Sequence, residues 1–535
     1  MRYNFTFLLL FISFAVFSQE DAWVYFSAKP NSQAFFNNPL AELSQKALDR
    51  RTNQNIALDF TDVPLETSYV DQVKTSTGIT VLAQSKWLNA LHIRGTQTNI
   101  NALKTLSFVA KVDFANKSLN TTAKRFLETK ENQTKDKLKT AIDYSYGTSA
   151  NQIQMLNGQV LHQQNFTGEG KTIAVLDAGF PGVNTAQPFA NLRNNGKILG
   201  GYDFTNRSSN FYTGDNHGTL VLSTMGGYKE NALVGTAPNA SYYLFITEIA
   251  AVEIPLEESL WVEAAEQADA LGVDIITTSL GYFGDRNNAL YNHTYSDMDG
   301  KTTFISRAAE IAFNKGILVL ASAGNEGNQT EKHIGSPADA VSVLAIGSVT
   351  ASKVKSTFSS IGPSFDGRIK PDIMAQGTAS VISDENGNIG IADGTSFSCP
   401  IMAGMAASLW QAFPSKTNKE IRQMILASAD RYTNPDNNYG YGIPNFGSTL
   451  SVDNFVTETA FSVYPNPVET SVTFSFLNEN NTALVTIYSV LGQKVIETQI
   501  DNTNPILSLQ TLASGLYFYT FDAGNLHKTG KIIKQ

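Results

Sequence analysis

The sequence has only one cysteine, Cys399, among its 535 residues. A single cysteine excludes an intramolecular disulfide, so the stability of the fold must come from packing and from any bound ions. Cys399 itself lies inside an apolar run, where a small buried hydrophobe is the better interpretation than a reactive thiol. The chain also lacks a basic excess, since its formal net charge is −9 at pH 7. Nucleic acid and anionic membranes are therefore not expected partners.

Long apolar runs are equally scarce. The first, Phe5–Phe17, follows the positive charge of Arg2 and precedes Ser18. This is the pattern of a cleaved signal peptide, residues 1–18, and it is too short for a helix that spans a membrane. The second, Gly394–Phe413, is interrupted by small polar residues and is interpreted as a buried helix. We therefore expect an exported protein without a transmembrane anchor.

The length predicts two to four domains. Residues 19–140 read as an α+β module with antiparallel strands that ends in a charged, cleavable linker, residues 116–141. Its candidate strands are Ala22–Ala28, Gly78–Gln84, Ala90–Gly95 and Phe108–Phe114, and its candidate helices are Pro39–Arg51 and Thr98–Leu106. Residues 145–455 form the central domain. From residue 460 to 535, short alternating strands broken by Pro and Gly turns predict a small β-sandwich.

The stretch GTSFSCP offers a serine nucleophile, Ser396, at the start of the buried helix. The first N–H groups of a helix are unpaired and its dipole is positive there, so an oxyanion beside Ser396 would find donors in place. The alternative is a plain helix cap, a role that serine and threonine favour for steric and hydrogen-bonding reasons alone.

A base and a carboxylate for this serine can be found upstream. Among six histidines, His217 precedes a small, apolar run that predicts a buried helix, which places its ring at a helix start. Asp177 directly follows the apolar run Ile173–Leu176, so it ends a buried strand at the edge of an α/β sheet where sites are usually built. The order Asp177, His217, Ser396 is one of the known orders of a catalytic triad.

Four segments carry a resemblance to the subtilisin-like serine peptidases: VLDAGF around Asp177, HGTLV around His217, SAGNEG around Asn325 and GTSFSCP around Ser396. Weaker matches extend it over residues 145 to 450. The resemblance implies an α/β fold, a parallel sheet with helices on both faces, with Asp177, His217 and Ser396 as the triad. It also implies that residues 19–140 are an inhibitory propeptide.

Two further site assignments follow from the same resemblance. Asn325 is the expected side-chain donor to the tetrahedral oxyanion, although its setting in Ala-Gly-Asn-Glu-Gly is also that of a turn residue. Ser279, Leu280 and Gly281 are the expected substrate-binding edge, whose backbone would pair with an extended peptide.

The sequence departs from the family's common pattern in two places. Ala178 stands where many relatives have Ser or Thr, which alters a hydrogen bond near Asp177. The insert 284–301 is long and polar, and we expect it to be a solvated loop at the rim of the cleft. Its Asp297–Gly300 stretch faintly resembles a calcium loop but lacks the ladder of ligands. No metal ligands are assigned, no cofactor is required for the chemistry, and structural calcium is left open.

The C-terminal segment resembles the sorting domain of type IX secretion cargo in three features: the Tyr464–Pro467 run, the Ser514–Tyr517 run and the closing Lys-Ile-Ile-Lys. The alternative is a carbohydrate- or protein-binding β-module, but no aromatic platform or ligand cluster is evident.

These observations predict a secreted or surface serine endopeptidase that is made as a zymogen, acts on proteins or peptides and uses the type IX secretion machinery. The rival is a catalytically inactive surface adhesin or binding protein on the same fold, which would usually have lost one of the triad residues. An α/β-hydrolase would need a G-x-S-x-G elbow, which is absent.

Overall fold

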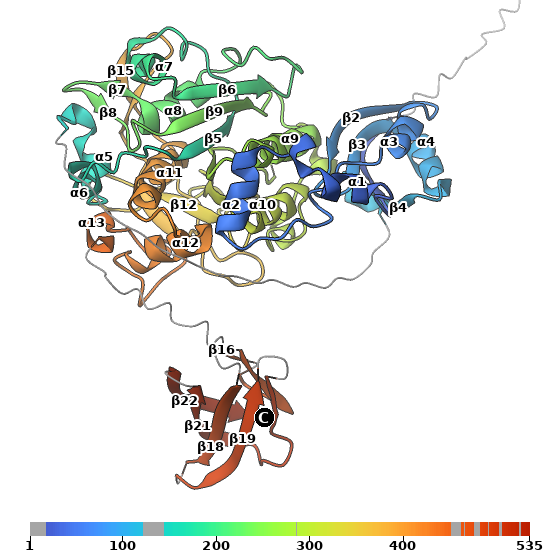
Figure 1. Ribbon diagram of the computed structural model, residues 1–535, viewed down its shortest axis with the longest axis vertical. Helices are drawn as coiled ribbons and strands as arrows, with labels where there is room; N and C mark the ends of the chain where they lie inside the picture. The colour runs from blue at the N-terminus through green and yellow to red at the C-terminus, as the bar shows by residue number, and fades with distance from the viewer. Residues whose placement is uncertain are drawn as a thin grey trace, which may run out of the picture. The chain divides into compact units, whose positions relative to one another are not determined.

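The computed structural model describes residues 18–120, 144–284, 286–450, 462–464, 466–475, 482–490, 492–501, 505–523 and 526–535 (Figure 1). Most of the predicted signal peptide and linker lies outside these ranges. The chain divides into two compact units, residues 1–450 and 451–535, which are described separately here. Within the described ranges, every helix falls short of the length and apolar character that crossing a bilayer requires.

Seven parallel strands form the central sheet of the first unit, and every residue of the strands is buried in five of them; the edge strand β6 is mostly half-buried. The order across the sheet is β13 (Ile373–Gln376), β12 (Leu344–Val349), β11 (Leu318–Ser322), β10 (Ile275–Thr278), β5 (Thr172–Asp177), β9 (Ser241–Ile246) and β6 (Ile198–Asp203). Runs that are apolar on both faces are typical of a parallel sheet covered on both sides.

Helices cover both faces of this sheet. On one face, α9 (Pro255–Ala270) and α10 (Phe304–Asn314) share a core with Ile276 of β10. The next residue, Thr277, points to the opposite face, where its hydroxyl meets Cys399 of α11 (Thr395–Ala412). The predicted buried helix is thus confirmed. The predicted α/β architecture, with helices on both faces, is confirmed as well.

The remaining elements of this domain are short or peripheral. They are α5 (Ala150–Gln154), α6 (Gln159–Gln163), α7 (Ala190–Asn194), α8 (His217–Gly226), α12 (Asn418–Ala427), α13 (Phe446–Thr449) and the hairpins β7 (Tyr228–Lys229)–β8 (Leu233–Val234) and β14 (Ser380–Ser383)–β15 (Ile389–Ala392).

Residues 19–120, called here the N-terminal module, form an antiparallel sheet with the order β2 (Ile79–Ser85), β3 (Ala90–Thr96), β1 (Gln19–Phe26) and β4 (Val109–Phe114). All four predicted strands are confirmed. The helices of the module are α1 (Ser32–Asn37), α2 (Gln45–Asn53), α3 (Thr67–Lys74) and α4 (Gln97–Ala102). The predicted helix over residues 39–51 instead begins at Gln45, because the Ser44 side chain accepts a hydrogen bond from Ala47 N–H and caps it there.

The sheet of the N-terminal module is apolar on both faces. Ala22 and Val24 of β1 pack toward α3 and α4. Trp23 lies on the other face, where its indole stacks on Phe304 of α10 and donates a 2.9 Å hydrogen bond to Ser259 of α9. The alternation along β1 therefore joins the module to the central domain.

The second unit contains two antiparallel sheets. One consists of β16 (Ser462–Tyr464), β17 (Ser471–Ser475) and β20 (Ile506–Ser508), and the other of β19 (Lys494–Asp501), β18 (Thr482–Ser489), β21 (Gly515–Ala523) and β22 (Leu526–Lys534). Val472 and Phe474 of the first sheet share a core with Ile487 and Phe521 of the second. The predicted β-sandwich is therefore confirmed.

Candidate active site

The predicted triad residues sit at the ends of three different elements. Asp177 is the last residue of β5, His217 is the first residue of α8 and Ser396 is the second residue of α11. The loop before α8 is drawn against β5 by Gly214, which has a φ of +83° and lies so close to Ala178 that a Cβ would come 2.3 Å from its carbonyl oxygen. Only glycine fits this position.

Asp177 and His217 form a hydrogen-bonded pair. His217 Nδ1 lies 2.7 Å from Asp177 Oδ1, which also accepts a 2.7 Å hydrogen bond from the N–H of Ala178. Because an ionised carboxylate only accepts, Nδ1 carries the proton and Nε2 is the basic nitrogen of the neutral ring. The charge of Asp177 raises the pKa of His217 above its ordinary value against the opposing effect of burial.

The second carboxylate oxygen of Asp177, Oδ2, is buried and has no hydrogen-bond partner among the described residues. Residue 178 is an alanine and offers no hydroxyl to it. The bond between Asp177 and His217 is present with alanine at position 178.

Ser396 is 9% exposed at the start of α11. Its hydroxyl donates one hydrogen bond within the described part of the chain, at 3.4 Å to the carbonyl of Ser279, and none to His217. The His217 ring lies 6.2 Å from the ring of the next residue, Phe397, between ring centroids. Contacts between a nucleophile and its base are often long before substrate binds, so this geometry is compatible with proton transfer.

The side-chain amide of Asn325 is held in one orientation. Its Oδ1 accepts hydrogen bonds from the N–H and the hydroxyl of Thr395, both at 3.0 Å. The Nδ2 donor therefore has no partner among the described residues. The amide lies beside Thr395, the residue that precedes Ser396. A neutral donor fixed in this way is suited to an anion that develops next to Ser396.

Ser279, Leu280 and Gly281 directly follow β10. Ser279 is tied to Ser396 by a 2.8 Å hydrogen bond from its hydroxyl to the Ser396 carbonyl. The backbone groups of Leu280 and Gly281 have no hydrogen bonds to other described residues, and Gly281 is exposed. An extended peptide can pair with such an open backbone edge.

Cys399 lies one turn further along α11 and is fully buried. Burial raises the pKa of its thiol to about 12, which keeps it protonated. The prediction that Cys399 is a buried apolar residue is confirmed.

The prediction of a solvated loop over residues 284–301 is wrong for much of the insert. Arg286 and His293 are less than one tenth exposed, and both pair with the buried carboxylate of Glu258 in α9. A carboxylate inside the protein needs a positive partner, and the insert supplies it. Asp297 caps its own turn by accepting from Thr294 N–H at 2.6 Å.

One group of three carboxylates among the described residues has the spacing of a cation site: Glu248, Glu253 and Glu257. Glu257 already accepts hydrogen bonds from two backbone N–H groups, and Glu248 accepts one from the hydroxyl of Tyr282. Burial and the neighbouring carboxylates raise the pKa of Glu248 well above its usual range.

Two functional carboxylates on α9 were not predicted from the sequence. Glu266 accepts from Trp87 N–H at 3.0 Å and from Ser85 Oγ at 2.6 Å, and Glu263 accepts from Gln84 N–H at 2.8 Å. Glu263 thus holds the end of β2 of the N-terminal module, and Glu266 holds the end of β2 and the loop after it. Their partners lie about 180 positions away in the chain, so no local pattern could reveal them.

Comparison with known families gives three matches. The model of the subtilase family matches residues 168–442. The model of the peptidase S8 propeptide domain of Bacteroidota matches residues 21–136. The model of the secretion system C-terminal sorting domain matches residues 462–535.

Curated relatives align over the same central region. Subtilisin NAT of Bacillus subtilis subsp. natto is 29% identical over 298 residues, which are 55% of this chain and 69% of that protein. The subtilisin of Bacillus pumilus is 28% identical over 298 residues, 55% of this chain and 95% of that protein. Serine protease AprX of Bacillus subtilis (strain 168) is 30% identical over 317 residues, 54% of this chain and 67% of that protein.

Replacing Asp177 with Asn should lower the pKa of His217, because the imidazolium loses its charged partner. A pKa raised in the folded state means that the pair stabilises the fold fully below about pH 6.5, the usual value for an unfolded histidine, and that this contribution is lost as the pH rises through the folded-state pKa. NMR titration of labelled histidine side chains would measure the shift. His162, whose pKa burial lowers to about 4, serves as the internal control. An unchanged His217 would contradict the pairing.

Proposed function

We propose, because this chain belongs to the subtilase family, that it cleaves proteins by attack of Ser396 on a peptide carbonyl carbon. It is a serine endopeptidase of that family with a propeptide. The observation that carries the proposal is the 2.7 Å contact between His217 and Asp177, which leaves Nε2 of His217 as the basic nitrogen in a site where Ser396 begins a buried helix.

In the first step, Ser396 Oγ attacks the carbonyl carbon while its proton passes to Nε2 of His217. Asp177 stays ionised and stabilises the imidazolium that forms. His217 then gives the proton to the nitrogen of the leaving amine as the peptide bond breaks. An acyl group is left on Ser396, and water removes it by the same sequence of proton transfers.

The negative charge of the tetrahedral intermediate would be bound by Nδ2 of Asn325 and by the N–H of Ser396. The Asn325 amide is already oriented through its two hydrogen bonds from Thr395, so no reorganisation is needed when the charge develops. The open backbone of Ser279 to Gly281 would bind the substrate as an added strand. Main-chain recognition of this kind fits extended segments of proteins.

The chain is organised as a precursor for export. The propeptide model over residues 21–136 indicates a zymogen, and the C-terminal sorting domain indicates export across the outer membrane. We assign residues 1–18 to the signal peptide, 19–140 to the propeptide with its linker, 145–455 to the peptidase domain and 460–535 to the sorting domain. No cofactor takes part in the proposed chemistry.

Ser396→Ala should abolish proteolysis and removal of the propeptide, because it removes the hydroxyl that attacks the peptide carbonyl. Expression in a host without other peptidases should give an uncut precursor, which mass spectrometry would identify. Ser398→Ala is the matched control, since the Ser398 hydroxyl donates to the Thr395 carbonyl at 3.0 Å within the helix. Normal processing of the Ser396 variant would refute the assignment, and an inactive wild-type protein would favour an adhesin.

Asn325→Leu should lower kcat by about 10²–10³ with little change in KM, which is the magnitude known for an oxyanion donor in subtilisin. Asn325→Asp keeps the oxygen that binds Thr395 but replaces the donor with a negatively charged acceptor, so it should lose activity as well. Steady-state kinetics on a peptide substrate would measure both. The exposed Asn195→Leu is the control. A loss confined to KM would mean that Asn325 binds substrate and transition state equally.

Ending the chain at Glu458 should leave the purified enzyme active, because the second unit has its own core and no residue of the candidate site. In a host with type IX secretion, the shortened enzyme should collect in the periplasm. Activity assays on cell fractions would locate it, with the full chain as the control. Equal export of both forms would show that the sandwich has another task.

A further inference from the structure

Between β1 and α3 the propeptide extends a segment, residues 27–66, that contains α1 and α2 and lies against the ends of α9 and α10 (Figure 1). We call this segment the arm. At the base of the arm, the ammonium group of Lys29 donates hydrogen bonds to the carbonyls of Phe60, Val63 and Lys86 at 2.8, 2.5 and 2.7 Å. The two ends of the arm are thereby held together, which gives it a fixed shape.

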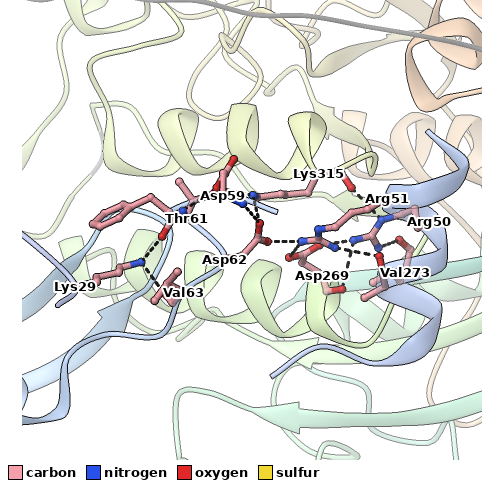
Figure 2. A network of polar contacts seen from close by, with 12 residues as sticks. Lys29, Arg50, Arg51, Asp59, Thr61, Asp62, Val63, Asp269, Val273 and Lys315 are labelled. Atoms are coloured by element: carbon pink, nitrogen blue, oxygen red, sulfur yellow. Dashed lines mark hydrogen bonds and ion pairs between the residues drawn. The ribbon is translucent and has the colours of Figure 1, made fainter. Parts of the chain in front are cut away.

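The guanidinium group of Arg50 enters the space between the C-terminal ends of α9 and α10 (Figure 2). It donates to the carbonyls of Lys315, Val273 and Asp269 at 3.0, 2.5 and 3.4 Å and pairs with the Asp269 carboxylate. The last carbonyls of a helix lack partners within it and carry partial negative charge. The flat guanidinium fork can serve several such acceptors at once, whereas a lysine ammonium cannot.

The ion pairs continue through the arm as a chain of alternating charge. Arg51 bridges Asp269 and Asp62, both at 2.7 Å, and Lys315 bridges Asp62 and Asp59 at 2.8 and 2.9 Å (Figure 2). The propeptide thus offers cations to Asp269 and carboxylates to Lys315. Complementarity in both directions favours this segment over one with a single sign of charge.

This network is shielded from water. Asp62 and Asp269 are fully buried, and Arg51 and Lys315 are 2% exposed. Burial alone would raise the pKa of Asp269, but the charges of Arg50 and Arg51 hold it below its usual range. Removing one partner of such a pair leaves an uncompensated charge in the interior, which is strongly unfavourable.

The backbones of the propeptide and the central domain approach each other closely at this contact. Gly272, just after α9, has a φ of +78°, and a Cβ there would lie 2.7 Å from the Ala47 N–H nitrogen of the arm. Around it, Ala270 packs with Leu43 and Ala47 of the arm. The Ser44 N–H also donates to the Ala270 carbonyl at 2.8 Å.

The arm binds far from the triad. Val273 and Lys315 precede β10 and β11, whereas Ser279 and Asn325 follow the same strands. The arm therefore holds the amino-terminal edge of the sheet, and the candidate active site lies at its carboxyl-terminal edge.

We propose that the C-terminal ends of α9 and α10 form a guanidinium-binding pocket, filled in the precursor by Arg50, that latches the propeptide and sets how long it stays bound after the chain is cut. The proposal rests on the proposed function only in treating residues 19–120 as a segment that is cut off. This latch is separate from any contact that the propeptide makes in the active-site cleft.

The test uses the full chain carrying Ser396→Ala, with the recognition sequence of a site-specific protease inserted after Leu127. Cutting at that sequence leaves the propeptide bound without a covalent link. Gel filtration after dilution into 0.15 M NaCl then gives the rate at which the propeptide fragment separates. Because the chain needs no activity of its own, this result is independent of whether Ser396 is the nucleophile.

Arg50→Met and Asp269→Asn should each raise the dissociation rate about thirtyfold or more, as expected when a buried, hydrogen-bonded charge loses its partner. Arg50→Lys should raise the dissociation rate nearly as much as Arg50→Met, because an ammonium group cannot reach all of the acceptors. Lys74→Met is the control: it removes the same charge from an exposed position on α3 and should change the rate less than twofold.

A double-mutant cycle separates the pocket from general damage to the arm. The rate increase for Arg50→Met with Asp269→Asn should be smaller than the product of the two single effects, because both substitutions remove the Arg50–Asp269 ion pair. If Arg50→Met prevents folding, Arg50→Lys takes its place in the cycle, since it keeps the positive charge and loses the planar fork. Multiplicative single effects, an Arg50→Lys rate equal to wild type, or rates that all agree within twofold would overturn the proposal.

Discussion

Carboxylates buried inside this chain each need a positive or hydrogen-donating partner, and much of the architecture depends on meeting that need. Asp177, fully buried at the end of β5, is met by His217. Glu258 in α9 is met by Arg286 and His293 of the insert. Asp269, at the end of the same helix, is met by the two arginines of the propeptide arm. The first pairing orients the ring of His217, the second fixes a long loop, and the third joins two domains.

The parallel sheet explains why these pairings fall where they do. Strands β5, β10 and β11 run in one direction, so their carboxyl ends bring Asp177, Ser279 and the loop of Asn325 to one edge. The helices that return across the sheet end at the opposite edge, where the carbonyls of Asp269, Val273 and Lys315 accept hydrogen bonds from Arg50. One edge therefore gathers side chains for chemistry, and the other presents acceptors to which a donor can dock.

The sequence predicted the parts that local patterns encode. Burial on both faces of β5 and of α11 is visible as unbroken apolar runs, and alternation predicted the four strands of the propeptide. The triad assignment came from residue types at element ends together with a family resemblance. The insert was mispredicted because its polar residues look solvated until Glu258 is placed beside them. The arm was missed for a related reason: Arg50 and Asp269 are 219 positions apart, and a basic pair on a short helix looks like a solvated face.

The two-faced sheet of the propeptide has a thermodynamic consequence. Trp23 and Trp87 are buried in the precursor in a core that they share with apolar residues of α9 and α10. Detachment exposes that apolar face to water at a cost of about 25 cal/mol for each Å². While the propeptide and the central domain share one chain, dilution cannot separate them. After cleavage, the association depends on the concentration of the two fragments. In a large extracellular volume the concentration of the dissociated propeptide is very low, so it does not rebind.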